Sequence, residues 1–210
     1  MPELYSQKTV AQFLDELASS APAPGGGSGA ALAGALGAAL ASMVCNLTVG
    51  KPKYADVQEE IQRLLAQTEA LRARLTNLIE QDIAVYYKLS ACYKMPRDTD
   101  EQKATRTAAI QKVLLEATAV PMSIAEACVG VLQLCTPIAE KGNVGAVSDA
   151  GVAALFAEAA LRSAALNVLI NLAAIKDADF VARERAKLDG LLAGKAELKE
   201  QIYSLVVSKL

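Results

Sequence analysis

The chain has 210 residues, of which 53% are hydrophobic and 21% charged, so a single folded domain with a sizeable core is expected. This composition excludes a disordered chain, and a net charge of −2 without a basic tract argues against a nucleic-acid partner. Histidine is absent, which excludes Ser-His-Asp triads, Cys-His dyads and histidine-based zinc sites. Any acid–base catalyst must therefore be Asp, Glu, Lys, Tyr or Cys, and no metal site is expected.

The cysteines indicate a reducing environment. Cys45, Cys92, Cys128 and Cys135 fall in apolar helical stretches and lack the spacing of a metal site. Buried, reduced thiols are the expected state of such cysteines. The first residues are polar and run into an amphipathic pattern, so no signal peptide is expected. We therefore expect a cytoplasmic protein.

The first informative motif follows an amphipathic helix that is predicted to begin at Val10. Residues 22–28 read Pro-Ala-Pro-Gly-Gly-Gly-Ser. Gly25, Gly26 and Gly27 let the backbone approach a ligand closely, and Ser28 stands where a helix N-cap belongs. The loop is a candidate cradle for an anion or heteroatom at a helix N-terminus, and a simple tight turn with a cap explains the same residues.

The next helix carries no charge, since no charged side chain occurs between Glu16 and Lys51. One face of this helix holds small residues, with Gly34 and Gly37 among them, and the opposite face holds Leu and Met. The segment is rich in alanine and lacks flanking Lys or Arg clusters, which argues against a membrane span. We predict a central helix that is apolar all round, buried, and closely crossed by another helix of this or a second subunit.

A helical pattern then runs unbroken from about Lys53 to Tyr93. Such a helix would be about 60 Å long. It would be too long for a compact monomer of this size, whose radius of gyration is roughly 17 Å. We therefore expect an elongated bundle and a dimer built from helices. The next helix is expected to run to about Val120, where Pro121 begins or kinks another.

The last third of the chain is also helical. Ser148 and Asp149 are expected to cap a long apolar helix that ends near Ile175, and further helices begin near Asp177 and Lys195. No segment has the pattern of a strand. Residues 1–210 are therefore predicted to form one all-α domain of about eight helices.

Asp82 is the strongest candidate for chemistry. It lies in the middle of the long helix beside apolar residues one turn away on either side, namely Leu78 and Tyr86. A partly desolvated Asp has a raised pKa and suits acid–base work near neutral pH. A carboxylate at the edge of the apolar face that pairs with Lys or Arg fits the spacing equally well.

Other polar residues allow two interpretations each. Asn167 and Asn171 lie one turn apart in a nearly apolar helix and either bond between helices or read a ligand in a pocket. Asn143, with Ser148 and Asp149, fits ordinary helix-stop and capping chemistry. Arg106 fits a solvated helix charge.

Taken together, these motifs in this order resemble one known domain. They are the glycine loop with its Gly/Ala helix, Asp82, the segment from Pro96 to Arg106, the Gly-Asn…Ser-Asp stretch at 142–149, and residues 166–172. The chain resembles, over nearly its whole length, the cyclodeaminase domain of formiminotransferase-cyclodeaminase. Related bacterial proteins are described as methenyltetrahydrofolate cyclohydrolases.

The resemblance implies an all-α, dimeric folate enzyme with its active site in a cleft and Asp82 as the catalytic residue. It also implies a set of substrate-binding residues, of which Arg97 replaces an expected Lys and could contact the glutamate tail of folate: Gly25, Gly26, Gly27, Ser28, Arg97, Arg106, Asn143, Ser148, Asp149, Asn167 and Asn171. No cofactor beyond the tetrahydrofolate substrate is implied. The expected partners are a tetrahydrofolate derivative, with or without a polyglutamate tail, a second copy of the chain and a separate formiminotransferase.

The family reaction converts 5-formiminotetrahydrofolate to 5,10-methenyltetrahydrofolate with loss of ammonia. A cyclohydrolase that opens the methenyl ring to 10-formyltetrahydrofolate would use the same pocket and the same Asp. The sequence leaves these two reactions open. A non-catalytic folate-binding or scaffolding partner of a formiminotransferase, and a membrane-associated helical protein, are the weaker alternatives.

Overall fold

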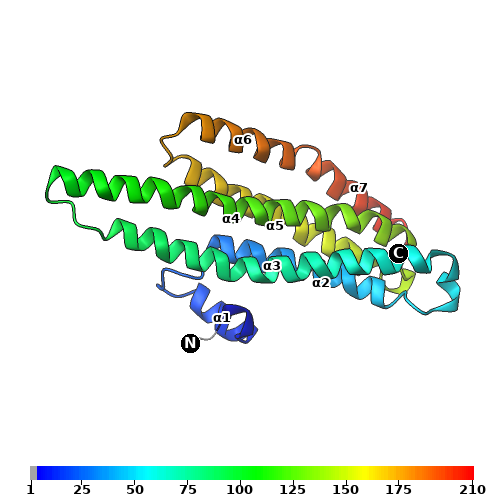
Figure 1. The fold of residues 1–210 in the computed structure, drawn as a ribbon. Coiled ribbons are helices and arrows are strands. Elements are labelled where there is room, and N and C mark those ends of the chain that lie inside the picture. Colours follow the sequence, from blue (N-terminus) through cyan, green and yellow to red (C-terminus); the bar gives the residue numbers. More distant parts are fainter. Residues whose placement is uncertain (1–3) are drawn as a thin grey trace.

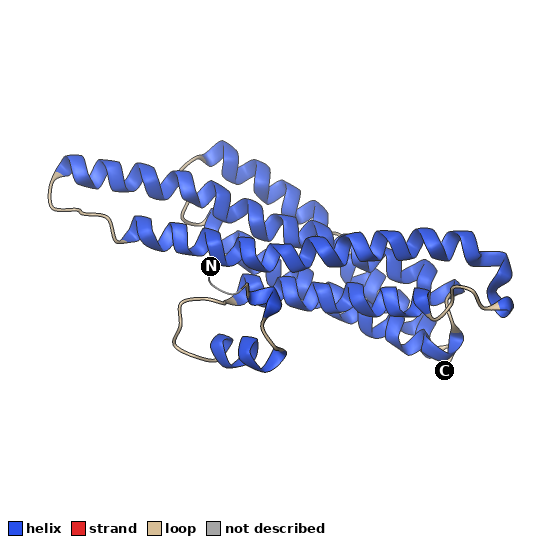
Figure 2. Cartoon of the chain, turned by 60° about the horizontal axis from the view of Figure 1, so that its bottom comes forward, coloured by secondary structure: helices blue, strands red, loops and turns tan. Residues whose placement is uncertain are grey.

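The computed structural model describes residues 4–210, and these residues form helices and loops without a strand (Figure 2). Seven α-helices and three short 3-10 helices (η) occur in this part of the chain, which confirms the all-α class. In chain order they are η1 (Tyr5–Gln7), α1 (Val10–Leu17), α2 (Gly26–Asn46), η2 (Pro52–Val57), α3 (Gln58–Tyr93), α4 (Asp100–Lys141), η3 (Val144–Ala146), α5 (Val147–Leu172), α6 (Ala178–Leu192) and α7 (Lys195–Val207).

Two long antiparallel helices, α3 and α4, give the molecule its elongated shape (Figure 1). They contain 36 and 42 residues, so each is more than about 50 Å long at 1.5 Å per residue. The turn between them ends in a capping box, in which the Thr99 hydroxyl accepts from the Gln102 amide at 3.2 Å. The predicted long helix therefore exists, and a second one of similar length lies beside it.

The bounds of these two helices differ from the prediction. The segment from Lys53 begins as the 3-10 helix η2, because Tyr54 has non-helical backbone angles and its hydroxyl accepts from the Val144 amide at 3.0 Å. Helix α4 does not end at Val120 but continues through Pro121. Buried apolar residues occur on both sides of this proline, and their packing outweighs the hydrogen bond that proline removes.

Helix α2 lies against α3, α4 and α5 through its small residues. A Cβ added at Gly34 would lie 2.8 Å from the Cys128 sulfur of α4, and one at Gly37 would lie 3.0 Å from the Ala153 carbonyl oxygen of α5. The predicted close crossings thus occur within this chain. The prediction that α2 is buried all round is wrong, since Leu36 on its other face is 47% exposed.

Helix α5 begins differently from the prediction. The 3-10 turn η3 precedes it, and Asn143 caps that turn by accepting from the Gly145 amide at 3.0 Å. Ser148 and Asp149 therefore fall inside the first turn of α5 and do not cap it. The helix ends at Leu172, a few residues before the predicted end.

Three cysteines are buried and free, as predicted, and Cys92 is half-buried. Burial raises the pKa of Cys45 to about 11 and the pKa values of Cys128 and Cys135 to about 12. These thiols are therefore inert parts of the core, and none of them is available as a nucleophile near neutral pH.

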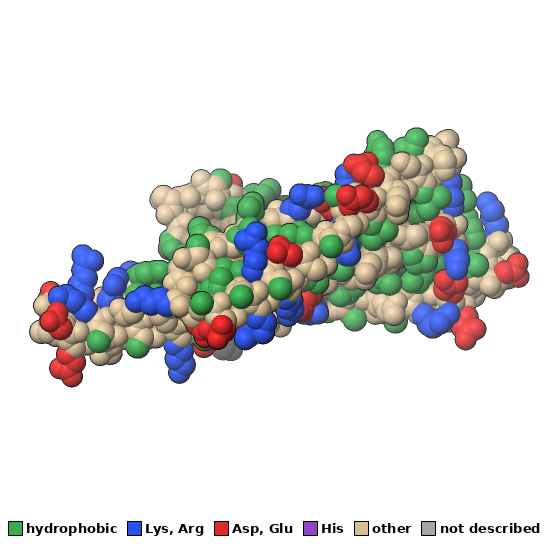
Figure 3. Space-filling view, turned by 90° about the horizontal axis from the view of Figure 1, so that it is seen from above, with side chains coloured by type: hydrophobic (Ala, Val, Ile, Leu, Met, Phe, Trp, Pro, Cys, Tyr) green, Lys and Arg blue, Asp and Glu red, His purple; other side chains and the backbone are tan. Residues whose placement is uncertain are grey.

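Three helical stretches, residues 26–46, 100–141 and 144–172, are long and apolar enough to cross a membrane by length and composition. In this bundle, 61%, 61% and 50% of their most apolar windows are buried inside the protein. Half or more of each window therefore packs against other parts of the bundle. On the face shown in Figure 3, acidic and basic side chains alternate over the described residues, so that face offers no continuous basic surface.

Candidate active site

The glycine loop leads into the N-terminus of α2, which contacts the middle of α3. Gly25 is the N-cap residue, in extended conformation, and the helix begins at Gly26. Ser28 lies inside the first turn, so the prediction that it is the N-cap is wrong. A Cβ added at Gly27 would lie 2.6 Å from the carboxyl carbon of Asp82, so only glycine allows α2 and this carboxyl group to approach so closely.

Ser28 instead binds Asp82 directly. Its hydroxyl donates to Asp82 Oδ2 at 2.7 Å, and Ser28 itself is fully buried. Burial raises the pKa of the Asp82 carboxyl above its ordinary value, and the hydrogen bonds from the Ser28 hydroxyl and backbone oppose that rise in pKa. The group is therefore poised to exchange a proton closer to neutral pH than an ordinary Asp.

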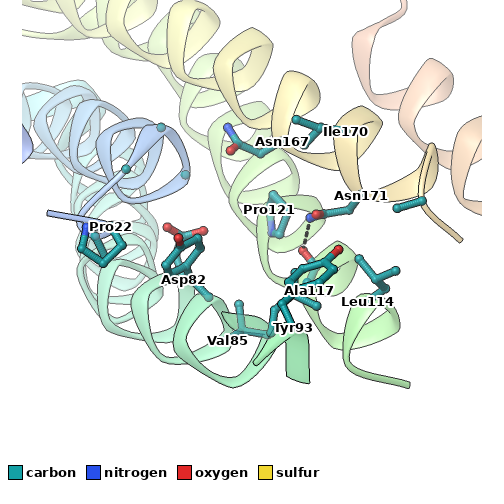
Figure 4. Close-up of a pocket in the computed structure, with 17 residues that line it drawn as sticks. Pro22, Asp82, Val85, Tyr93, Leu114, Ala117, Pro121, Asn167, Ile170 and Asn171 are labelled. Atoms are coloured by element: carbon teal, nitrogen blue, oxygen red, sulfur yellow. Dashed lines mark hydrogen bonds between the residues drawn. The ribbon is translucent and has the colours of Figure 1, made fainter. Parts of the chain in front are cut away.

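Asp82 faces a cavity of about 440 Å³ between α2, α3, α4 and α5 (Figure 4). This volume is in the range of small-molecule sites. The cavity wall is mostly apolar and aromatic, with the polar groups of Asp82, Asn167 and Asn171 among them. The residues that line it are Pro22, Ala23, Gly25, Gly26, Gly27, Asp82, Val85, Tyr86, Leu89, Tyr93, Leu114, Ala117, Pro121, Asn167, Ile170, Asn171 and Ala174.

Both predicted asparagines of α5 reach this cavity. The Asn167 amide lies over the glycine loop, since a Cβ added at Gly26 would be 3.6 Å from it. Asn171 lies one turn further along α5, across the cavity from Asp82 (Figure 4). Seven predicted positions therefore share one site, on the glycine loop and its helix, on α3 and on α5: Gly25, Gly26, Gly27, Ser28, Asp82, Asn167 and Asn171.

Arg106 borders the site through Tyr93. Its guanidinium donates to the Tyr93 carbonyl oxygen at 3.1 Å and lies 5.8 Å from the centre of the Tyr93 ring. Tyr93 lines the cavity, so Arg106 supports its rim. Arg97 lies exposed in the turn before α4 and is not among the lining residues.

Three predicted positions lie elsewhere. The Asn143 side-chain amide donates to the Leu47 carbonyl oxygen at 2.9 Å, beyond the C-terminus of α2, whereas the cavity lies at its N-terminus. The 21 residues of α2 separate these ends by about 30 Å. Ser148 and Asp149 lie in the first turn of α5, far from Asn167 near its end. Within one chain, the fold does not bring these three residues to Asp82.

The residues of α3 and α4 that form the apolar and aromatic part of the cavity lining were not predicted from the sequence. Tyr86, Leu89 and Tyr93 follow Asp82 at intervals of four, seven and eleven residues, so they share its helix face. That spacing could have identified them. Pro121 and Leu114 of α4 carry no such signal, because only the packing of α4 against α3 brings them to the site.

The chemistry of the site depends on a carboxyl group and amides. Residues 4–210 contain no cluster of three or more His, Cys, Asp or Glu side chains that could hold a metal ion. The arrangement can bind a flat, mostly apolar ligand with polar edges and can move a proton at Asp82 Oδ1, the oxygen that does not accept from the Ser28 hydroxyl.

Known proteins are similar to this chain in sequence. The formiminotransferase-cyclodeaminase family matches residues 9–190. A methenyltetrahydrofolate cyclohydrolase of Methylorubrum extorquens is 48% identical over 206 residues, which cover 98% of this chain and 99% of that protein. A formimidoyltransferase-cyclodeaminase of Sus scrofa is 37% identical over 185 residues, which cover 88% of this chain but 34% of that protein.

A solved structure agrees with these similarities. The crystal structure of formiminotetrahydrofolate cyclodeaminase from Thermotoga maritima has a TM-score of 0.80 and 30% identity, and the match covers 97% of this chain and 96% of that one. The family match and the 48% identical relative both span most of the chain, and the named relatives are all enzymes. The chain therefore belongs to the formiminotransferase-cyclodeaminase family.

Proposed function

We propose that this chain is a folate one-carbon enzyme that hydrolyses 5,10-methenyltetrahydrofolate to 10-formyltetrahydrofolate, with Asp82 as its acid–base catalyst. The observation that carries the proposal is the Asp82 carboxyl, held by Ser28 on one oxygen and facing a cavity of about 440 Å³. The 48% identity with a cyclohydrolase over almost the full length of both chains favours hydrolysis. The sequence alone left hydrolysis and deamination open.

The reaction needs one group that accepts a proton and returns it. The Asp82 carboxylate takes a proton from water as the water oxygen attacks the methenyl carbon, which gives a tetrahedral centre between N5 and N10. The bond from this carbon to N5 then breaks, and N5 receives the proton from Asp82. The new hydroxyl loses its proton to solvent and becomes the formyl oxygen on N10. Such proton transfer contributes about 10²–10⁴-fold to the rate.

The cavity suits the other demands of the reaction. Tyr86 and Tyr93 offer aromatic surface to a flat pterin ring, and the apolar wall around Leu89 and Leu114 limits the water that reaches the ring. Holding the reacting carbon beside Asp82 supplies the remaining acceleration by orientation. The substrate itself carries the one-carbon unit, so the proposal includes no further cofactor.

Deamination of 5-formiminotetrahydrofolate is the second candidate. The similarity to the Thermotoga maritima cyclodeaminase structure, which covers nearly all of both chains, favours it. The same carboxyl could take the N10 proton and give one to the departing ammonia. Both reactions use the same cavity.

Absorbance of the methenyl band distinguishes the two reactions. The purified chain is incubated with 5,10-methenyltetrahydrofolate in one assay and with 5-formiminotetrahydrofolate in another. We expect the methenyl absorbance to fall faster than in a protein-free control. A rise from the formimino substrate together with released ammonia would instead identify a cyclodeaminase. No change with either substrate would contradict both reactions.

A further inference from the structure

Pro121 leaves a carbonyl oxygen in α4 without its helical partner. In an α-helix the carbonyl of residue 117 accepts from the N–H of residue 121, but proline has no N–H. Ala117 and Pro121 are both buried, so water does not replace the missing donor easily. The side-chain nitrogen of Asn171 on α5 supplies it and donates to the Ala117 carbonyl oxygen at 2.6 Å (Figure 4).

This bond fixes which way the Asn171 amide points. A carbonyl oxygen only accepts, so the amide atom that faces it must be nitrogen. The Asn171 oxygen is therefore directed away from Ala117, and Asn171 lines the cavity. Asn167 is fixed in the same sense, because its nitrogen donates to the Ser163 carbonyl oxygen at 2.9 Å. Two amide oxygens, one helical turn apart, are thus left as acceptors on the α5 side of the site.

We propose that the side-chain oxygens of Asn171 and Asn167 form an acceptor wall that binds N–H donors along one edge of the ligand. Pro121 is the positioning residue that orients Asn171. This inference rests on the proposed function. A pterin has such an edge, formed by its 2-amino group and ring N3–H, at the end of the bicycle away from N5. Asp82 and Asn171 lie on opposite sides of the cavity, so binding this edge at α5 turns N5 toward Asp82 (Figure 4).

The test measures a ratio of affinities. Tetrahydrofolate and its analogue without the 2-amino group are titrated at equilibrium, and neither carries the one-carbon unit. We expect the wild-type chain to bind tetrahydrofolate at least about tenfold more tightly, since the analogue covers the part-buried Asn171 oxygen without giving it a donor. In Asn171→Ala the two affinities should become similar. The control is Asn77→Ala, which removes an exposed amide from α3, outside the cavity. It should keep the wild-type ratio.

A second variant separates recognition from support of the fold. Asn171→Ala also leaves the Ala117 carbonyl without a donor, which lowers stability. Adding Pro121→Ala to it restores the helical N–H, so the double variant should regain melting temperature but not the preference for the 2-amino group. A return of the preference in the double variant would show that Asn171 only supports α4, and would overturn the proposal.

Pro121→Ala alone tests the positioning role. The Ala117 carbonyl then has its helical donor, the Asn171 amide is free to turn, and the affinity ratio should fall below that of the wild type. An unchanged ratio would remove Pro121 from the proposal. If the wild-type chain turns over folate but binds both ligands equally, the acceptor wall is wrong and the proposed function stands. If it neither binds nor turns over folate, the proposed function itself is wrong.

Discussion

Two opposing effects act on the pKa of the Asp82 carboxyl. Burial raises the pKa of Asp82, whereas the Ser28 hydroxyl, at 2.7 Å, stabilises the charged form. The balance keeps a base in an apolar cavity and still allows it to take up a proton. The hydrogen bond comes from the first turn of α2, which explains why the glycine loop and a residue 54 positions after Ser28 form one site.

Replacing Ser28 by Ala should move the pH dependence of activity. Loss of its hydrogen bond raises the pKa of Asp82 further, and hydrolysis begins with the carboxylate form. The rising limb of the kcat/KM profile should therefore shift to higher pH. Ser42→Ala is the matched control, because Ser42 is a buried serine of the same helix that bonds Thr68 instead, at 2.8 Å. An unshifted limb in Ser28→Ala would contradict this account of the carboxyl.

Gly27→Ala should displace the Asp82 carboxyl, because the added methyl would lie 2.6 Å from its carboxyl carbon. A displacement of about 1 Å at a reacting group costs on the order of 100-fold in rate. Gly29→Ala, two residues along the same helix, adds a methyl with no atom within 4 Å and should keep full activity. Equal rates for the two variants, measured by loss of methenyl absorbance, would show that the contact is unimportant.

At the scale of elements, glycine sets the distance between α2 and α5. The Gly37 Cα faces the Ala153 carbonyl oxygen, and a Cβ there would be 3.0 Å from it. Gly37→Val has no room for its methyl groups and should destabilise the fold by about 1–3 kcal/mol in denaturant unfolding. Gly190→Ala on α6, where nothing lies within 4 Å, should stabilise by roughly 0.5–1 kcal/mol. Equal midpoints for Gly37→Val and the wild type would contradict the spacing role.

The sequence predicted those elements whose signals are local. The Asp177 side chain caps α6 by accepting from the Phe180 amide at 3.0 Å, and α6 starts within a residue of its predicted position. The continuous α4 was not predictable, since packing on both sides of Pro121 overrides the local effect of proline. The pairing of Ser28 with Asp82 depends on how α2 crosses α3, which no local pattern encodes. In contrast, helical spacing alone could have placed Tyr86 and Tyr93 on the same face of α3 as Asp82.

At the scale of the whole molecule, adjacent helices leave apolar side chains exposed. Leu36 on α2 and Leu166 on α5 are 47% and 68% exposed, and Ile170, which lines the cavity, is 71% exposed. Apolar surface of this kind marks interfaces. We propose that a second copy of the chain covers it, as the elongated shape led us to expect from the sequence. Such a partner would border the cavity at Ile170.

Size measurements in solution test this assembly. The wild-type chain should be a dimer by light scattering, and the double variant Leu36→Glu, Leu166→Glu should be a monomer, because buried unpaired carboxylates are costly. Val207→Glu, at a 50% exposed position on α7, should remain dimeric. A monomeric wild-type chain at all concentrations would contradict the proposed assembly.

The most direct test of the account compares the rates at which wild-type protein and Asp82→Asn hydrolyse 5,10-methenyltetrahydrofolate, with Asp56→Asn as an exposed-carboxyl control. We predict a loss of about 10²–10⁴-fold in kcat for Asp82→Asn, with an unchanged circular dichroism spectrum, and full activity in the control. A rate for Asp82→Asn within a few-fold of the wild type would contradict the central claim that this carboxyl carries the reaction.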